Sequence, residues 1–311
     1  MDAPKVGLTF RLPGALVSRL RDQFPAAAFA GPGLDAPFQT ADANVILGWP
    51  KPEFVRAAKE LQWIQLFAAG TDIVDFRDTR ARGIVVTNAR GVGSPSIAEH
   101  VLAMMLHFNR RMGVLLRSQL EGRWIEKNSF DYPELNGQTL TVVGAGSIGS
   151  EIGRRARMLG MDSFGINTNG REVEGFDRTF AVKDSDDAVT RADHVVACIS
   201  GIGTNARVFD AAWFSKMKPG SHFYNVGRGN AVDETALLAA LDGELIAGAG
   251  LDVTELEPLP PGHPFWTHPK VLLTQHKAMN SGRYWERLAD LFADNLARFV
   301  QGRPLLNIVQ T

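Results

Sequence analysis

Short apolar segments alternate with amphipathic segments along most of the 311-residue chain. The apolar runs have the length of buried strands and are rich in branched and aromatic residues. They form two series, the first at 5–10, 44–49, 63–67 and 84–88, and the second at 139–144, 163–167, 178–182, 194–200, 222–227, 248–253 and 271–274. Because helical patterns separate the runs, the sequence predicts an α/β fold with parallel sheets that helices cover on both faces.

The helical patterns divide the chain into two domains. Shorter ones lie at 13–22, 51–60, 147–159, 208–217 and 233–241. A long one near 95–121 separates the two series, and a last amphipathic helix is expected from Tyr284 to Val300. The first series lacks enough helix to cover its sheet, so we expect the last helix to return to it. This predicts one domain from 1–93 plus 281–311 and an inserted domain at 94–280, with hinges near 91–97 and 276–282.

Composition narrows the range of partners and compartments. The net charge is −1, and no basic run exceeds the pair Arg110-Arg111, which argues against nucleic acid or an anionic membrane as a partner. The single Cys198 excludes a disulfide framework. The N-terminus does not read as a signal peptide, and no apolar run reaches the roughly 20 residues of a membrane helix. We therefore expect a soluble, cytoplasmic protein.

A glycine-rich loop follows the predicted strand at 139–144. Gly144, Gly146 and Gly149 have the spacing G-x-G-x-x-G, and Ser147 and Ile148 open the predicted helix. The first glycine permits a tight turn, the second lets the backbone approach a pyrophosphate, and the third lets helix and strand pack closely. In this strand–loop–helix context the loop predicts a Rossmann-type dinucleotide site at the helix N-terminus.

The next strand ends without the acidic residue that usually binds the adenine ribose of NAD. Asn167 stands at that position, followed by Thr168, Asn169 and, two residues later, Arg171. A neutral loop with an arginine accepts a 2′-phosphate that a carboxylate would repel. The sequence thus favours NADP over NAD. An ordinary polar turn with Arg171 in water and the use of both cofactors remain open alternatives.

Four charged residues follow strands of the second series. Arg228 stands between two glycines, Asp252 and Glu257 follow the next strand, and His276 comes directly after the last one. Ligands of open α/β sheets bind beyond the carboxyl ends of the strands, so these side chains are expected to face one crevice with the nicotinamide.

At this point the chain resembles the D-specific 2-hydroxyacid dehydrogenases. The resemblance rests on AAGTD (68–72), SIAEHVLAMML (96–106), the glycine loop, MKPGSHFYNVGRG (217–229), LDVTELEPLP (251–260) and PFWTHPKVLLTQH (264–276). The order and spacing of Arg228, Glu257 and His276 match the catalytic triad of that family. The resemblance implies two Rossmann-like domains, a flavodoxin-like substrate domain and the inserted dinucleotide-binding domain. It further implies an active site in the cleft between them and a homodimer joined through the nucleotide-binding domains.

The reduction of a small 2-oxo acid requires a hydride and a proton. His276 suits the proton transfer, because an ordinary histidine pKa of about 6.5 lies near neutral pH. Glu257 would orient the imidazole and stabilise its charged form. Arg228 would bind the substrate carboxylate and polarise the carbonyl.

The resemblance assigns further contacts. Backbone N–H groups around Ala69 and Gly70 would bind the substrate carboxylate, and Asp252 would bind the nicotinamide carboxamide. Trp49 either lines the substrate pocket or caps the core. Lys277 departs from the family pattern and points either to solvent or to a second acidic group on the substrate.

The remaining histidines and the cysteine carry less weight. His100 and His107 lie seven residues apart on one helical face, which is first of all a packing pattern. No cluster has metal-ligand spacing, so we predict no metal site. Cys198 lies inside a predicted buried strand, so we interpret it as a small core residue.

The favoured function is therefore an NAD(P)-dependent reductase of small 2-oxo acids such as glyoxylate or hydroxypyruvate. The alternative is a nucleotide-sensing, corepressor-like binding protein on the same fold, which would bind the cofactor without useful turnover. Use of another hydride donor, such as formate or phosphite, has no support from a particular residue.

Overall fold

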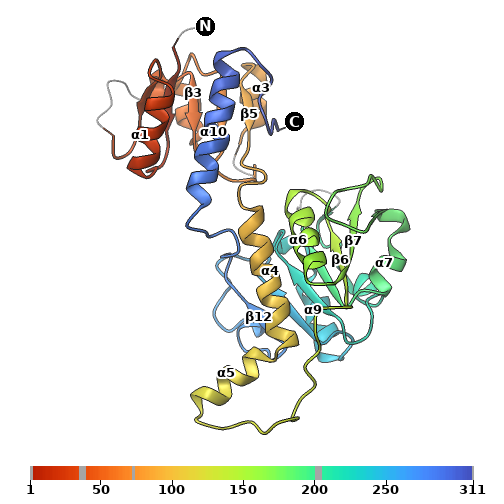
Figure 1. Cartoon of the computed structure of the whole chain (residues 1–311). Helices are drawn as coiled ribbons and strands as arrows, with labels where there is room; N and C mark the ends of the chain where they lie inside the picture. The colour runs from red at the N-terminus through yellow and green to blue at the C-terminus, as the bar shows by residue number, and fades with distance from the viewer. Residues whose placement is uncertain (1–2, 35–39, 72–73, 200–204, 310–311) are drawn as a thin grey trace. The chain divides into compact units, whose positions relative to one another are not determined.

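The computed structural model describes residues 3–34, 40–71, 74–199 and 205–309. The chain divides into two compact units, residues 1–93 with 281–311 and residues 94–280 (Figure 1). None of the helices among the described residues combines the length and apolarity that crossing a bilayer requires.

The first unit is built on a five-stranded parallel sheet with the order β2-β1-β3-β4-β5. This is the strand order of flavodoxin-like folds. The strands are β1 (Lys5–Leu8), β2 (Ala28–Ala30), β3 (Val45–Leu47), β4 (Trp63–Gln65) and β5 (Val85–Thr87). The helices are α1 (Gly14–Gln23), α2 (Pro52–Ala57), α3 (Phe76–Ala81) and α10 (Tyr284–Val300), with a short 3₁₀ turn at Thr40–Asp42.

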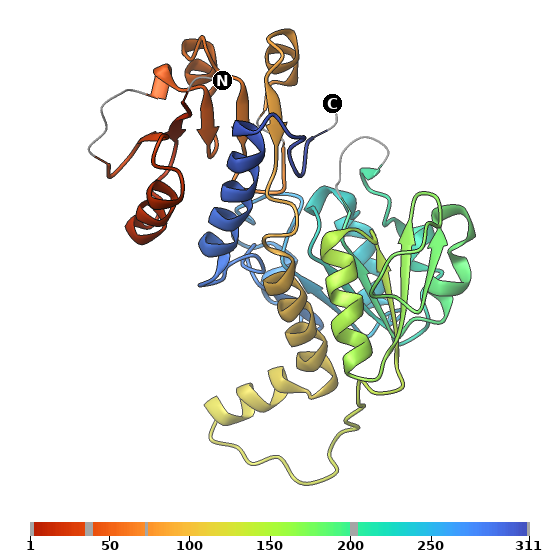
Figure 2. The same ribbon diagram turned by 45° about the horizontal axis from the view of Figure 1, so that its top comes forward.

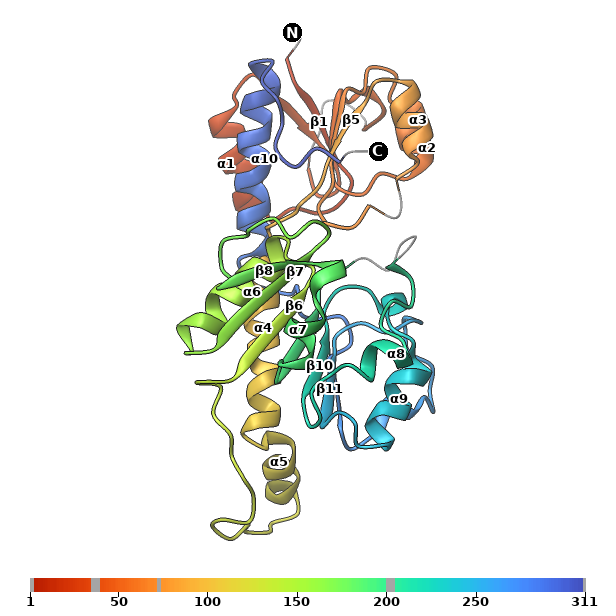
Figure 3. The same ribbon diagram turned by 90° about the vertical axis from the view of Figure 1, so that its right-hand side faces the viewer.

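Two cores sandwich this sheet. Helices α1 and α10 lie on one face, where Leu20 and Phe292 pack with Trp63, and α2 and α3 cover the other (Figure 3). The C-terminal helix therefore does belong to the first unit. It has a strongly amphipathic pattern, and its apolar stripe supplies much of the core on that face.

The second unit is built on a seven-stranded parallel sheet with the order β12-β11-β10-β9-β6-β7-β8. The strands are β6 (Thr139–Val143), β7 (Asp162–Asn167), β8 (Arg178–Ala181), β9 (His194–Ala197), β10 (His222–Asn225), β11 (Gly248–Leu251) and β12 (Val271–Leu273). The order reverses between β6 and β9, as in a nucleotide-binding Rossmann sheet. The structure confirms the predicted class, an α/β protein with two parallel Rossmann-like sheets.

Helices cover both faces of this sheet as well. Helices α4 (Ser94–Asn109) and α6 (Ser147–Met158) lie side by side on one face, as Figure 2 shows. Helices α7 (Asp186–Thr190), α8 (Ala211–Phe214) and α9 (Glu234–Asp242) pack on the other. Short 3₁₀ turns lie at Val182–Asp184, Gly229–Ala231 and Pro264–Trp266. Both faces of strand β9 are buried, because Val195 belongs to the core on one face of the sheet and Val196 to the core on the other. This explains why the sequence of the strand is continuously apolar rather than alternating.

The long helical segment near 95–121 is two helices rather than one. Helix α4 ends at Asn109, and α5 (Met112–Leu120) begins after Arg111, whose backbone is left-handed at φ 54°. A residue in this conformation ends an α-helix, which sequence periodicity does not reveal. The chain after α5 returns to β6 as an extended segment (Figure 1). Strand β2 and helices α3 and α7 were not predicted, because three to six residues carry too little periodicity.

A buried polar cluster lies at the amino ends of β9 and β10. The His194 Nδ1 lies 3.0 Å from the Tyr224 hydroxyl, and its Nε2 lies 2.9 Å from the Gln138 side-chain oxygen. The His222 ring stacks on that of His194 and also contacts Phe108. Burial lowers the pKa of His194 to about 3 and that of His222 to about 4.

The low pKa values of His194 and His222 predict that the folded protein loses stability in acid. Below about pH 6.5 the unfolded chain binds protons at both positions, whereas the folded chain does not until pH falls to about 3 or 4. The free energy of unfolding should therefore fall by about 2 kcal/mol for each histidine between about pH 7.5 and pH 5. Urea unfolding at several pH values measures this slope. His222→Phe should make the slope shallower, and an unchanged slope would contradict the assignment.

Candidate active site

The glycine loop connects β6 to the N-terminus of α6. Gly144 has φ +105°, which a side chain would strain. A Cβ added to Gly149 would lie 2.4 Å from the carbonyl oxygen of Gly144, so strand and helix approach too closely for any other residue. At Gly146 a Cβ would meet no protein atom within 4 Å, which leaves open space beside the helix N-terminus. The loop therefore offers room for a pyrophosphate where helix N–H groups attract anions.

A cavity of about 510 Å³ opens at this loop. It lies at the point where the strand order reverses, between the ends of β6 and β9, and extends along the end of β7. Its lining includes Gly144, Gly146, Asn167, Thr168 and Ile199. Ser147, Ile148 and Gly149 form the first turn of α6 behind the loop. The volume, the open space at Gly146 and the apolar walls fit the nucleotide half of a dinucleotide.

Asn167 uses its side chain to shape the loop after β7. Its side-chain oxygen accepts hydrogen bonds from the N–H groups of Asn169 (3.2 Å) and Gly170 (2.7 Å), and its amide donates to the carbonyl of Arg171 (2.7 Å). The Asn169 side chain in turn accepts from the N–H of Arg171 at 3.2 Å. The two asparagines thus make a closed polar turn. Within the described part of the chain the Arg171 guanidinium has no hydrogen-bond or ion-pair partner and is exposed.

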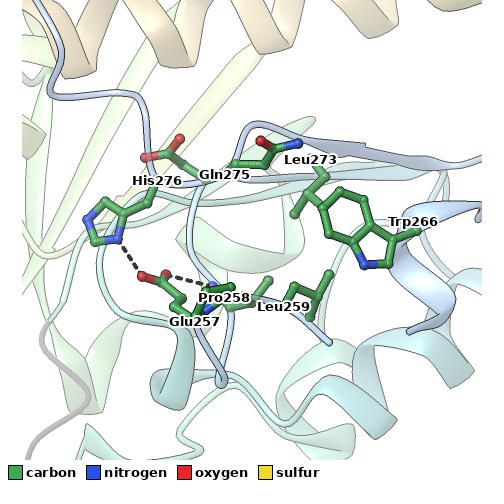
Figure 4. A pocket seen from close by; sticks show the side chains of 9 residues that line it. Glu257, Pro258, Leu259, Trp266, Leu273, Gln275 and His276 are labelled. Atoms are coloured by element: carbon green, nitrogen blue, oxygen red, sulfur yellow. Dashed lines mark hydrogen bonds and ion pairs between the residues drawn. The ribbon is translucent and has the colours of Figure 1, made fainter. Parts of the chain in front are cut away.

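Glu257 and His276 form a close pair at the carboxyl end of the sheet. The Nδ1 of His276 lies 2.6 Å from a carboxylate oxygen of Glu257 (Figure 4). The other carboxylate oxygen accepts the N–H of Thr254 at 3.2 Å. Since a carboxylate only accepts hydrogen bonds, Nδ1 carries a proton. The Nε2 atom makes no hydrogen bond to the described residues, and half of the side chain is exposed.

A second cavity, of about 410 Å³, lies beside this pair. Its apolar walls include Leu259, Trp266 and Leu273, with Glu257 and His276 at one side (Figure 4). Such walls reduce the access of water to one side of the carboxylate–imidazole pair.

Asp252 directly follows β11 and is only 3% exposed. One carboxylate oxygen accepts the Thr274 hydroxyl (2.7 Å) and the N–H of Lys277 (2.8 Å). Both oxygens lie within 3.2 Å of the N–H of Ala278. A contact of Asp252 to the nicotinamide stays a prediction. In the structure its carboxylate binds the segment that carries His276.

Arg228 follows β10 in the segment that begins a 3₁₀ turn. Its side chain is partly buried, and one guanidinium nitrogen donates to the carbonyl of Gly227 at 3.0 Å. The side chain of Asn225 donates to the carbonyl of Arg228 and accepts the N–H of Gly227, which fixes the backbone of the turn. Gly229 is required there, because a Cβ would lie 1.9 Å from backbone atoms of Thr254.

The predicted substrate contacts Trp49, Ala69 and Gly70 belong to the first unit. Trp49 follows β3, is 37% exposed and packs edge-on against Phe67 at 5.1 Å. Ala69 is exposed, and its carbonyl accepts the Asn88 side chain at 2.8 Å. The last residue of the AAGTD motif, Asp72, lies outside the described residues. These residues lie at the carboxyl ends of the strands of their own sheet, where ligands of such sheets bind.

The cysteine and the possible metal-binding side chains of the described residues do not form a second reactive site. Burial raises the pKa of the Cys198 thiol to about 12, so this residue is not a thiolate nucleophile at neutral pH. Among the described residues, no group of three or more His, Cys, Asp or Glu side chains is placed to hold a metal ion.

The fold and the site define a class: a dinucleotide-binding oxidoreductase with a carboxylate–histidine pair. Residues 102–278 match the model of the D-isomer specific 2-hydroxyacid dehydrogenase, NAD binding domain. The chain belongs to the D-isomer specific 2-hydroxyacid dehydrogenase family.

Individual relatives agree with this family. Glyoxylate/hydroxypyruvate reductase B of Citrobacter koseri is 31% identical over 98% of both chains. D-3-phosphoglycerate dehydrogenase of Archaeoglobus fulgidus is 31% identical over 83% of this chain, which spans about half (49%) of that protein. The solved D-isomer specific 2-hydroxyacid dehydrogenase of Xanthobacter autotrophicus Py2, in complex with NADPH and MES, has a TM-score of 0.82 and 27% identity over 100% of this chain and 98% of that one.

Sequence reasoning missed two residues of this site. The Nε2 of His100 on α4 lies 2.9 Å from the Thr274 hydroxyl, which itself donates to Asp252. Thr274 could have been predicted as a site residue, because it lies at the end of a strand two residues before His276. His100 could not, because it lies 174 residues before Thr274 in the chain and nothing local links the two.

Gly146→Ala tests the phosphate site. The added methyl meets no protein atom, so the melting temperature should stay within a degree or two of the original. Binding of NADPH, measured by its fluorescence, should weaken by about 10-fold or more if a pyrophosphate occupies this space. Gly149→Ala is the contrasting variant, because its methyl collides with the Gly144 carbonyl and should lower the melting temperature itself. Unchanged NADPH affinity in Gly146→Ala would place the phosphates elsewhere.

Proposed function

We propose that the protein is an NAD(P)-dependent reductase of small 2-oxo acids that yields the D-2-hydroxy acid. The observation that carries this proposal is the 2.6 Å contact between Glu257 and His276, in the same unit as a glycine loop suited to a dinucleotide. Family membership supports the reaction class. The relative from Citrobacter koseri, a glyoxylate/hydroxypyruvate reductase, supports small 2-oxo acids as substrates.

Each site residue has a separate role in the proposed reaction. When bound, the nicotinamide supplies the hydride to the carbonyl carbon. His276 delivers a proton from Nε2 to the carbonyl oxygen, while Glu257 holds the ring by Nδ1 and stabilises the imidazolium form. Arg228 stays charged at every working pH, and its planar fork binds the substrate carboxylate and polarises the carbonyl. The family resemblance assigns further contacts to the substrate carboxylate to the backbone around Ala69 and Gly70.

We further propose NADP as the preferred cofactor. The loop after β7 presents amide and hydroxyl groups where a carboxylate would repel a 2′-phosphate. The exposed guanidinium of Arg171 is the group that pairs with this phosphate. Thr168 lines the cavity and offers a further hydroxyl donor. The NADPH complex of the relative from Xanthobacter autotrophicus supports this choice.

A homodimer is the expected assembly. Helix α5 and the segment after it expose large apolar side chains, among them Leu120 at 88% and Trp124 at 87%. Exposed apolar patches of this kind mark association surfaces. Sedimentation equilibrium measures the mass independently of shape, and a single species of 33.9 kDa would contradict a dimer.

Initial rates with glyoxylate, hydroxypyruvate, pyruvate and a 2-oxo diacid, each with NADPH and with NADH, test the reaction. His276→Ala should keep the cofactor dissociation constant and lower kcat by about 10²–10⁴-fold, the usual contribution of a positioned acid. Unchanged turnover would remove His276 from the mechanism. Cofactor binding without turnover of any acid by the unaltered protein would instead favour a nucleotide-sensing, corepressor-like role.

Two substitutions test the cofactor preference. Arg171→Ala should weaken NADPH by about 10- to 100-fold, the contribution of a charge-assisted hydrogen bond, and leave NADH nearly unaffected. Asn167→Asp should shift the preference toward NADH, because the carboxylate repels the phosphate. Lys183→Ala is the matched control, since it removes an exposed positive charge outside the lining of the cavity. Equal losses of NADH and NADPH binding in Arg171→Ala would refute the role of this arginine.

A further inference from the structure

The segment that carries His276 has an unusual backbone. Gln275 and His276 both adopt left-handed conformations, with φ 55° and 56°. Gln275 is not a residue type that favours this conformation, and for a histidine it is still uncommon, so two such residues in succession are an unfavourable arrangement. Two consecutive residues in this region persist only where the surrounding structure holds them.

Asp252 is the group that holds them. Its carboxylate binds the hydroxyl of Thr274 before the left-handed pair and the N–H groups of Lys277 and Ala278 after it. The backbone carbonyl of Asp252 also accepts the N–H of His276. The segment is therefore bound to one buried residue on both sides of the imidazole.

The hydrogen atoms in this network can be assigned from chemistry. Thr274 has a single hydroxyl proton, and it points to the Asp252 carboxylate, which can only accept. Toward His100, the Thr274 oxygen is therefore the acceptor, and Nε2 of His100 is the donor at 2.9 Å. The same Nε2 lies 3.7 Å from the Asp252 carboxylate. The result is a directed chain from His100 through Thr274 to Asp252.

Helix α4 supports this segment at a second point. The hydroxyl of Ser96, one turn before His100, donates to the carbonyl of Met279 at 3.1 Å. Between the two attachments, Ala278 is only 4% exposed and belongs to the core that α4 shares with the sheet. The first turns of α4 thus contact the segment before and after the left-handed pair.

We propose that His100 and Thr274 are positioning residues for His276. The chain of hydrogen bonds from His100 through Thr274 orients the Asp252 carboxylate, and that carboxylate keeps the 274–278 segment in the conformation that presents His276 to Glu257 and to substrate. This inference rests on the proposed role of His276 as the proton donor. Neither side chain is required to touch substrate or cofactor.

Thr274→Val removes the hydroxyl and keeps the shape of the side chain. We expect kcat to fall by about 10- to 100-fold, because a displaced catalytic group loses this much rate, while the cofactor dissociation constant stays the same. The solvent deuterium isotope effect on kcat should rise, since proton delivery becomes slower relative to the other steps. Thr274→Ser restores the hydroxyl and should recover most of the rate.

Thr141→Val is the matched control. Thr141 is a fully buried strand residue of the same unit, and its hydroxyl donates to the carbonyl of Ala188. Its loss should lower the melting temperature about as much as Thr274→Val does, without changing kcat or the isotope effect. If Thr141→Val slows kcat equally, the effect of Thr274→Val is general destabilisation and the proposal is overturned.

His100 is tested by His100→Leu and His100→Gln, since glutamine places an N–H donor near the position of Nε2. Leucine should lower kcat and glutamine should largely preserve it. In the double variant His100→Leu/Thr274→Val the losses should be far from additive, because both substitutions interrupt one chain. Additive losses of kcat would show that the two residues act separately and would contradict the proposed chain of hydrogen bonds.

Hydrogen exchange of the Lys277 and Ala278 amides gives a measurement that does not depend on activity. Both N–H groups are bound by Asp252, so they should exchange faster in Thr274→Val and His100→Leu than in the unaltered protein. Absence of turnover in the unaltered protein would refute the proposed function but leave this readout intact. Unchanged exchange together with unchanged kcat would overturn the positioning role.

Discussion

The Asp252 carboxylate is the interaction on which the site depends. It is buried at the end of β11, and it is bound by the hydroxyl of Thr274 and two backbone N–H groups of the neighbouring segment. A buried carboxylate is costly unless such donors surround it, so the sheet edge and the segment stabilise each other. These hydrogen bonds lie on both sides of Gln275 and His276, which both adopt the left-handed conformation.

Parallel strands explain how residues far apart in sequence converge. The glycine loop after β6, the Arg228 turn after β10, Asp252 after β11 and His276 after β12 all lie at the carboxyl edge of one sheet. One unit thus contains a helix N-terminus that can attract phosphate, an arginine that can bind a carboxylate and a histidine that can transfer a proton. The chemistry proposed for this 2-hydroxyacid dehydrogenase family member is located at this edge, and the apolar strand interiors support it.

The loop after β7 shows how a small change in side chain alters recognition. An acidic residue at 167 would accept ribose hydroxyls, whereas Asn167 accepts two N–H groups of its own loop and donates to a third residue. The side chain that would contact the ribose instead builds the turn that carries Arg171. Under the proposed preference for NADP, the groups around residue 167 rather than its own side chain would discriminate between the cofactors.

The sequence alone determined the fold class, the order of most strands and helices, the glycine loop, and the residues Arg228, Glu257 and His276 as candidates. Periodicity and residue order carry this information because burial and strand ends repeat along the chain. Only the tertiary structure decided that the helix near 95–121 breaks at Arg111 and that Asn167 closes its own turn. It also decided that Thr274 forms hydrogen bonds with both Asp252 and His100. These features depend on hydrogen bonds whose partners are set by strand register and helix packing, and no local pattern records them.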